Sequence, residues 1–335
     1  MSDPVRVGLN GFGRIGRNVF RASLENDDVE IVGVNDVMDD EEIDYFAQYD
    51  TVMGTLDGAG VEDGVLSVDD TDFEAGVFHE TDPSELPWDD LDVDVAFEAT
   101  GIFRNYDDAS QHLDAGADKV LISAPPKGEK PVKQLVYGVN HDEYDGEDVV
   151  SNASCTTNSI SPVAKVLDDE FGIRSGQLTT VHAYTGSQNL MDGPNSKPRR
   201  RRAAAENIIP TSTGAAQATT EVLPELEGKL DGMAIRVPVP NGSITEFVTD
   251  LEADVTESDV NAAFEDAASG ELAGVLGVTD ESVVSSDIVG DPYSSQVDLG
   301  STNVVNGLTK VLTWYDNEYG FSNRMLDVAD YIADR

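Results

Sequence analysis

Cys155 is the only cysteine of the 335 residues, and it lies in the segment SNASCTTNSI, residues 151–160. Such a residue is either a small buried hydrophobic group or a nucleophile. An apolar stripe follows at Ile160, Val163 and Leu167 and predicts a helix that begins near the cysteine. A helix N-terminus stabilises negative charge, so we expect this position to lower the pKa of the thiol. The hydroxyl-rich neighbours favour the holding of an anion over an apolar core.

A nucleophilic cysteine needs a base or a cation nearby, and histidine is a common base. Of the four histidines, His182 lies in a segment of strand composition, QLTTVHAY, 27 residues after Cys155. A helix between Cys155 and this strand would let the strand run back past the cysteine, so that the imidazole of His182 could lie next to the thiol. The spacing alone leaves open the alternative that His182 is a packed core residue.

A Gly-x-Gly-x-x-Gly turn over residues 11–16 separates an apolar run from a helical pattern near the start of the chain. In such a turn the first glycine permits the tight bend, the second lets the backbone approach a pyrophosphate, and the third allows close packing of helix on strand. The pyrophosphate would sit on the helix N-terminus. We therefore expect this turn to bind a dinucleotide through Gly11, Gly13, Arg14 and Ile15.

A second predicted strand, residues 30–36, ends in Asp36, which follows the last glycine of the turn by 20 residues. An acid at this distance accepts from the adenosine ribose hydroxyls and disfavours the 2′-phosphate of NADP. Two further apolar runs, separated by a helical stretch over about 105–117, end in Thr100-Gly101 and in Ser123. Alternating strands and helices predict a doubly wound parallel sheet, with ligands at the carboxyl ends of its strands. We expect Thr100, Gly101 and Ser123 to contact the cofactor; a glycine-rich turn in another α/β fold is the alternative.

The charge of the chain is unusual: 65 Asp and Glu face 21 Lys and Arg, a net charge of −44. Such a surface repels nucleic acid and anionic membranes, so neither is an expected partner. The acids are scattered rather than massed in one tail, which favours a protein that requires salt and comes from a halophilic organism. The alternative is an ordinary acidic protein.

A single cysteine excludes an internal disulfide and a multi-cysteine metal site, and we expect no bound metal. The first residues carry no signal pattern, and no apolar stretch is long enough to span a bilayer. We therefore expect a cytoplasmic protein. A chain of 335 residues is longer than one hydrophobic core usually serves, so we expect two domains.

Several motifs stand in the order and spacing of one enzyme family: GLNGFGRIGRNVFRA, SCTTN, TVHAYTG, NIIPTSTGAA, GMAIRVPVPN and WYDNEYGFSNR. From about Val5 to the end, the chain resembles phosphorylating glyceraldehyde-3-phosphate dehydrogenases. The resemblance implies a homotetramer whose subunit has an α/β Rossmann domain (1–153) and an α+β catalytic domain (154–317) with a mostly antiparallel sheet. It also implies that the last helix, 318–335, packs back on the Rossmann domain.

The resemblance also implies roles for individual residues. Cys155 would be the nucleophile that forms a thioester, with His182 as the residue that activates it. NAD would accept the hydride, and Asn317 would bond the nicotinamide amide. Inorganic phosphate would be held by Ser154, Thr156, Thr213 and Gly214, and the phosphate of glyceraldehyde 3-phosphate by Thr185 and Arg236.

The chain departs from the family pattern at a few positions. Ser159 replaces a cysteine that often follows the nucleophile by four residues, Val37 replaces a proline after the ribose-binding acid, and Thr81 replaces an arginine near the adenine. These changes affect the predicted contacts with the adenosine end of the cofactor more than the predicted catalytic residues. Pro194 typically accompanies NAD preference, so with Asp36 it favours NAD, and use of NADP stays open.

Other functions and partners are compatible with parts of this pattern. The same fold acting on erythrose 4-phosphate would differ in the shape of its pocket and in how well phosphate attacks the thioester. A thiol acyltransferase or hydrolase would use Cys155 and His182 without the glycine turn, and a nucleotide-binding interaction protein would not need them. The basic run PRRRR, 198–202, is either an anion or nucleic-acid patch or a loop that packs between subunits; the negative field of the chain favours the loop.

Overall fold

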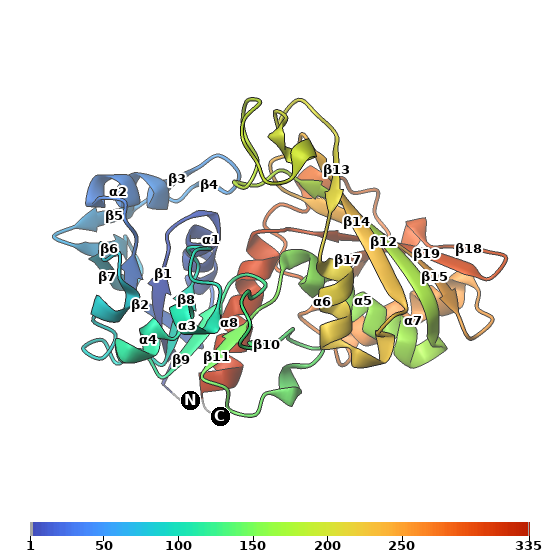
Figure 1. Ribbon diagram of the computed structural model, residues 1–335, viewed down its shortest axis with the longest axis horizontal. Coiled ribbons are helices and arrows are strands. Elements are labelled where there is room, and N and C mark those ends of the chain that lie inside the picture. The colour runs from blue at the N-terminus through green and yellow to red at the C-terminus, as the bar shows by residue number, and fades with distance from the viewer. Residues whose placement is uncertain (1–2, 334) are drawn as a thin grey trace. The chain divides into compact units, whose positions relative to one another are not determined.

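The computed structural model describes residues 3–333 and 335 and divides into two compact units. The first unit comprises 1–135, 141–154 and 322–335, and the second comprises 136–140 and 155–321. The last helix, α8 (Tyr319–Ala333), begins in the second unit and continues in the first. Figure 1 shows α8 in red.

The first unit is built on one sheet with the strand order β10-β11-β9-β8-β1-β2-β7-β6-β5. All neighbours from β10 to β7 pair in parallel, and β6 and β5 add an antiparallel edge. The strands are β1 (Val5–Asn10), β2 (Val29–Asn35), β5 (Ala59–Glu62), β6 (Val65–Val68), β7 (Glu74–Phe78), β8 (Val95–Glu98), β9 (Lys119–Ile122), β10 (Lys133–Gln134) and β11 (Val149–Ser151). Its helices are α1 (Arg14–Ser23), α2 (Asp40–Gln48), α3 (Tyr106–Ala109) and α4 (Gln111–Asp114), and β3 (Tyr49–Asp50) pairs with β4 (Gly54–Thr55).

The second unit has a mixed, mostly antiparallel sheet in the order β13-β14-β12-β15-β19-β17-β16, with β18 paired to β19. Its strands are β12 (Ile173–Ala183), β13 (Ile209–Ser212), β14 (Leu230–Val237), β15 (Ser243–Leu251), β16 (Leu276–Thr279), β17 (Ser295–Asp298), β18 (Asn303–Val305) and β19 (Leu308–Tyr315). Helices α5 (Cys155–Phe171), α6 (Ala215–Val222) and α7 (Glu257–Ser269) lie with this sheet (Figure 1).

The fold class predicted from the sequence is confirmed: a mostly parallel sheet in one unit and a mostly antiparallel one in the other. The predicted stripe at Ile160, Val163 and Leu167 is fully buried in the core of the second unit. The helical stretch expected over 105–117 is instead two short helices, α3 and α4. Asn105 caps α3 by accepting the Asp108 N–H, and α3 ends before Ser110, where the chain turns into α4.

Among the described residues, none of the helices has the length and apolar character needed to cross a membrane. Within the same part of the chain, no group of three or more His, Cys, Asp or Glu side chains is placed to hold a metal ion.

Candidate active site

The Cys155 thiol stands on the first residue of α5, as the apolar stripe predicted. Two residues earlier, Ala153 has a φ of 56°, a left-handed conformation that is uncommon for a residue with a Cβ. This strained residue turns the chain from β11 into α5. Cys155 as a whole residue is half-buried.

His182 brings its imidazole to the thiol from the end of β12. Its Nε2 lies 3.5 Å from the Sγ of Cys155. Its Nδ1 lies 2.7 Å from the carbonyl oxygen of Ala183 and donates to it, which leaves Nε2 as the acceptor that faces the sulfur. The contact that the sequence spacing permitted is therefore present.

The protonation of this pair follows from its burial. Burial, and then the positive charges of Arg236 and Arg200, lower the pKa of His182 to about 3, although the bond to Ala183 opposes the shift. Burial also raises the pKa of the Cys155 thiol, although the charge of Arg236 and hydrogen bonds from Thr156 oppose the rise. The expected lowering by the helix N-terminus is thus outweighed, because removal of water penalises the thiolate. At neutral pH the site holds a thiol beside a neutral imidazole.

Arg236 lies beside His182, because the two residues are register partners on the parallel strands β14 and β12. Its Nη1 donates to the Ala183 carbonyl at 2.8 Å and to the Thr185 hydroxyl at 3.4 Å. Its Nε is buried and has no hydrogen-bond partner among the described residues. The structure therefore brings together Thr185 and Arg236, and the guanidinium keeps donors for an anion.

Two further cations lie near Arg236. Burial lowers the pKa of Lys197, and the charges of Arg200 and Arg236 lower it further. The pKa of Arg200 is lowered in the same way, by burial and then by Arg236. Mutual repulsion of this kind is relieved when an anion binds.

Arg200 belongs to the basic run for which the sequence favours a loop that packs between subunits, and its charge acts on His182. The structure places Arg200 Nε 3.1 Å from the Thr211 hydroxyl, whereas Arg202 forms an ion pair with Asp192 at 2.8 Å. The density of this basic run in so acidic a chain is the sequence feature that marks the segment.

Tyr315 is a buried residue of the site that the sequence reasoning did not single out. Its hydroxyl bonds to those of Thr156 at 3.0 Å and Thr180 at 2.8 Å, and its ring meets the His182 ring edge-on. Burial raises the pKa of Tyr315 to about 12, so the hydroxyl stays protonated. The Thr156 hydroxyl, expected to hold phosphate, is thus turned into the interior. The signal for Tyr315 was its place in the motif WYDNEYG, beside Asn317.

Asn317 is held by neighbours that the sequence did not reveal. Its Oδ1 accepts from the Ser243 hydroxyl at 2.7 Å, and the same hydroxyl oxygen accepts the Ala183 N–H at 3.1 Å. Asp316 is buried and accepts from the side chain of Asn241 and from backbone N–H groups, which include that of Tyr319. The Asn317 Oδ1 is therefore occupied, and its amide nitrogen is the group left for a ligand.

The remaining phosphate candidates lie at element ends. Gly214 is the N-cap of α6, and the Thr213 hydroxyl accepts the Ala215 N–H at 3.1 Å. A helix N-terminus with a glycine cap suits an anion. Ser154 directly precedes Cys155 and is the last residue of its segment of the first unit.

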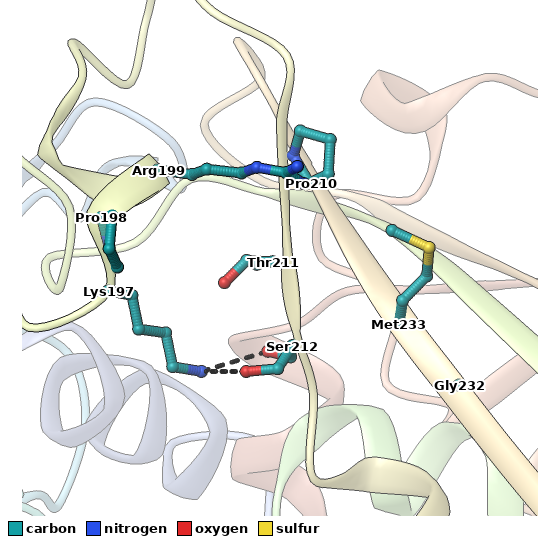
Figure 2. A pocket seen from close by; sticks show the side chains of 8 residues that line it. All are labelled: Lys197, Pro198, Arg199, Pro210, Thr211, Ser212, Gly232 and Met233. Atoms are coloured by element: carbon teal, nitrogen blue, oxygen red, sulfur yellow. Dashed lines mark hydrogen bonds between the residues drawn. The ribbon is translucent and has the colours of Figure 1, made fainter.

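A pocket of about 570 Å³ opens at the edge strand β13, and it is lined by none of the predicted site residues. Its walls come from η3 (Pro198–Arg201), β13 and β14. Figure 2 shows Lys197 reaching the backbone oxygen and hydroxyl of Ser212, with Met233 on the neighbouring strand. The pocket is therefore separate from the Cys155–His182 pair in its lining.

The glycine turn of the first unit has the geometry that a dinucleotide needs. Gly11 has a φ of +103°, and a Cβ on Gly16 would lie 1.9 Å from the Gly11 oxygen. A Cβ on Gly13 would meet no atom within 4 Å, so open space lies over this residue. Arg14 and Ile15 begin α1, and the Arg14 side chain pairs with Asp50. Only the backbone of Arg14 is thus left to approach a pyrophosphate.

Asp36 follows β2 and its carboxylate holds the glycine turn. Its Oδ2 accepts the Phe12 N–H at 2.6 Å, and its Oδ1 accepts the Met38 N–H at 3.1 Å. Because each carboxylate oxygen has a second lone pair, Asp36 retains acceptors for two ribose hydroxyls. These residues fit NAD.

The other cofactor candidates lie at the same edge of the sheet. Thr100 and Gly101 follow β8, Ser123 follows β9, and both strands are parallel to β1. The carboxyl ends of parallel strands meet at one edge, so the structure brings these residues to the edge that carries the glycine turn.

Comparison with known proteins covers both units. The family model described as "Glyceraldehyde 3-phosphate dehydrogenase, NAD binding domain" matches residues 5–106, and that of the C-terminal domain matches residues 154–317. A glyceraldehyde-3-phosphate dehydrogenase of Haloarcula vallismortis is 87% identical over 334 residues, which is 100% of each chain.

The chain belongs to the glyceraldehyde-3-phosphate dehydrogenase family. Relatives of that name from Bacillus subtilis and Streptomyces avermitilis are 52% and 51% identical, over 98% and 99% of each chain. The chain is accordingly an NAD-dependent oxidoreductase of glycolysis, and its first unit is a Rossmann domain. A thiol hydrolase without a nicotinamide cofactor, one of the alternatives left by the sequence, is set aside because the NAD-binding domain is matched.

Proposed function

We propose that the chain oxidises and phosphorylates D-glyceraldehyde 3-phosphate to 1,3-bisphosphoglycerate, through a thioester on Cys155. The observation that carries the proposal is the contact of 3.5 Å between the thiol and His182 Nε2, with Nδ1 held by Ala183. This arrangement supplies a nucleophile and a proton acceptor within reach of one carbon.

The chemistry starts from the neutral pair. The Cys155 sulfur attacks the aldehyde carbon, while its proton passes through His182 Nε2 to the aldehyde oxygen, giving a hemithioacetal. NAD, when bound, supplies the nicotinamide ring that accepts the hydride from this carbon. His182 Nε2 then takes the hydroxyl proton as the thioester forms. Because its pKa is low, the imidazolium is a strong acid that returns the proton to the sulfur when phosphate displaces it.

The reaction requires two bound anions, the phosphate of the substrate and the attacking inorganic phosphate. Arg236 and Thr185 hold the substrate phosphate, and the 3.4 Å contact between them supports this pairing. Ser154, Thr156, Thr213 and Gly214 hold the attacking phosphate, and we add Arg200 to this set because its charge acts on His182 and Arg236.

The cofactor contacts proposed for the first unit are those of Gly11, Gly13, Arg14, Ile15, Asp36, Thr100, Gly101 and Ser123. Asn317 donates its amide to the nicotinamide. Asp36 and Pro194 favour NAD over NADP, since a carboxylate repels a 2′-phosphate. Cofactor binding is assigned to the first unit and catalysis to the second.

One assay at high salt tests the mechanism. Protein, glyceraldehyde 3-phosphate and phosphate are mixed with NAD or NADP, and absorbance of the reduced nicotinamide is followed, with erythrose 4-phosphate as the competing aldehyde. Cys155→Ser is expected to abolish turnover, and His182→Gln to slow it by roughly 10²–10⁴-fold. Near-normal turnover in Cys155→Ser would show that the thioester mechanism is wrong.

We also propose that the chain forms a homotetramer. Between β12 and β13 and on β14, the apolar residues Leu190, Met191, Ile208 and Met233 are exposed, beside the basic run 198–202. Apolar side chains flanked by cations suit the acidic surface of a second copy. Light scattering at molar and at low salt tests this: a monomer at molar salt would contradict it.

A salt requirement and a cytoplasmic location complete the proposal. With a net charge of −44, self-repulsion destabilises the folded chain unless salt screens it, and at 1 M the Debye length is about 3 Å. Circular dichroism during dialysis from molar to dilute KCl is expected to show unfolding. A chain that stays folded in dilute buffer would contradict the requirement.

A further inference from the structure

A buried polar cluster lies under the glycine turn of the first unit, at the ends of β1 and β8. Its centre is Glu98, which is 1% exposed, with Asn10 at 2% and both His112 and Trp88 at 0%. The proposed chemistry uses none of these side chains. A carboxylate in such a place is costly unless hydrogen bonds satisfy it.

The Glu98 carboxylate accepts from donors on both oxygens. Its Oε1 accepts the Thr100 N–H at 2.9 Å and the Thr100 hydroxyl in a short bond. Its Oε2 accepts the Asn10 amide at 2.7 Å and faces His112 Nε2 at 3.4 Å. These donors take up the lone pairs that a carboxylate has.

The histidine of the cluster is oriented by a tryptophan. Trp88 Nε1 donates to His112 Nδ1 at 3.0 Å, and an indole nitrogen can only donate. Nδ1 is therefore the acceptor, so the proton of a neutral imidazole is on Nε2, where it points to Glu98. On the far side, the Asn10 Oδ1 accepts from the side chain of Asn35 at 2.7 Å.

The two residues that Glu98 holds begin the two turns of the predicted cofactor edge. Asn10 is the residue before Gly11, and Thr100 follows β8 by two residues. These turns touch: a Cβ on Gly11 would lie 2.7 Å from both the Ala99 carbonyl carbon and the Thr100 nitrogen. Glu98 thus binds one turn through Oε1, which accepts from Thr100, and the other through Oε2, which accepts from Asn10.

We propose that Glu98 is a positioning residue for NAD, which sets the Asn10–Gly11 turn and the Thr100 backbone in the arrangement that the dinucleotide requires. The proposal deepens the cofactor assignment above and rests on it. Glu98 does not touch the cofactor, and it acts through Asn10 and Thr100. Loss of one oxygen frees the turns to move relative to each other, so NAD binding weakens while the chemistry of the second unit persists.

Glu98→Gln is the test substitution, because glutamine has the same shape and replaces one acceptor by an N–H₂ donor. Every neighbour of the carboxylate donates, so one donor of the new amide must oppose another donor. The dissociation constant of NAD, measured by calorimetry on the full chain, is expected to rise roughly tenfold or more. The KM for NAD rises with it, whereas kcat at saturating NAD and the alkylation rate of Cys155 without NAD stay near the parent values.

Asp94→Asn is the matched control. Asp94 precedes β8 at the opposite end of the strand, where its Oδ2 accepts the Arg6 N–H at 2.7 Å. This substitution removes the same charge from the same sheet and is expected to leave NAD binding unchanged. A general effect of charge or stability would change both variants alike.

An unchanged dissociation constant in Glu98→Gln, or an equal rise in Asp94→Asn, would overturn the proposal. If Glu98→Gln does not fold, Asn10→Ser tests the same link from the other side, since it removes the amide that donates to Glu98 Oε2 and Asn10 is not itself an assigned cofactor contact. It is expected to weaken NAD binding, and binding as tight as in the parent would then overturn the proposal. Failure of the unmutated chain to bind NAD is a different result, because it contradicts the cofactor assignment itself.

Discussion

Arg236→Gln probes the assignment of the substrate phosphate most directly. The guanidinium is held by Ala183 and Thr185 through Nη1, while its buried Nε has no partner among the described residues. An anion bound through Nε and Nη2 gains two charge-assisted bonds, each of about 1.5 kcal/mol at the low end. Their loss corresponds to about 3 kcal/mol, or a rise in KM for glyceraldehyde 3-phosphate of roughly 100-fold.

The assay follows nicotinamide reduction at saturating NAD and phosphate while the aldehyde concentration varies. Arg174→Gln is the control. Arg174 lies at the start of β12, whereas His182 lies at the end of this strand, and Arg174 pairs with Asp250 at 3.0 Å. We expect its KM to stay unchanged. An unchanged KM in Arg236→Gln, or an equal rise in Arg174→Gln, would refute the reasoning that Arg236 binds the phosphate.

Three further outcomes follow from the geometry. Tyr315→Phe removes the hydroxyl that bonds to Thr156 and Thr180 and leaves the buried Thr180 hydroxyl without its partner, so we expect a loss of about 2 kcal/mol in stability, measured by denaturant unfolding at high salt; an unchanged midpoint would contradict this. The folded-state pKa of His182 is about 3, against an ordinary value of 6.5. Between these pH values the imidazole is protonated in the unfolded chain and neutral in the folded chain. Stability contributed by this residue therefore falls by about 1.4 kcal/mol per pH unit from pH 6.5 toward 3, and unfolding of His182→Gln across this range should lack that component. Gly16→Ala places a Cβ against the Gly11 oxygen and should abolish NAD binding in calorimetry; tight binding would show that the turn moves freely.

Much of the fold was predictable because it rests on local patterns. The glycine turn, the acid at the end of the second strand and the apolar stripe after Cys155 each report a local constraint on backbone or burial, and the structure shows the corresponding strand, turn and helix. The stretch over 105–117 was misjudged, because a capping asparagine and a turn at Ser110 divide one apolar pattern into two helices.

Of the candidate site, the sequence predicted the contact between Cys155 and His182. Cys155 and His182 are rare residue types, so composition and spacing single them out. Tyr315 and Ser243 are common residue types whose partners come from distant strands, so no local pattern predicts these contacts.

By itself, the sequence determined the family, the cofactor class and the net charge of the chain, because each is a property of residue type and order. Only the tertiary structure decided the protonation of the Cys155–His182 pair. A helix N-terminus favours the thiolate, but burial disfavours it more, and burial arises from the packing of segments far apart in the chain. The same holds for Glu98, whose donors become neighbours only when β1 and β8 pair.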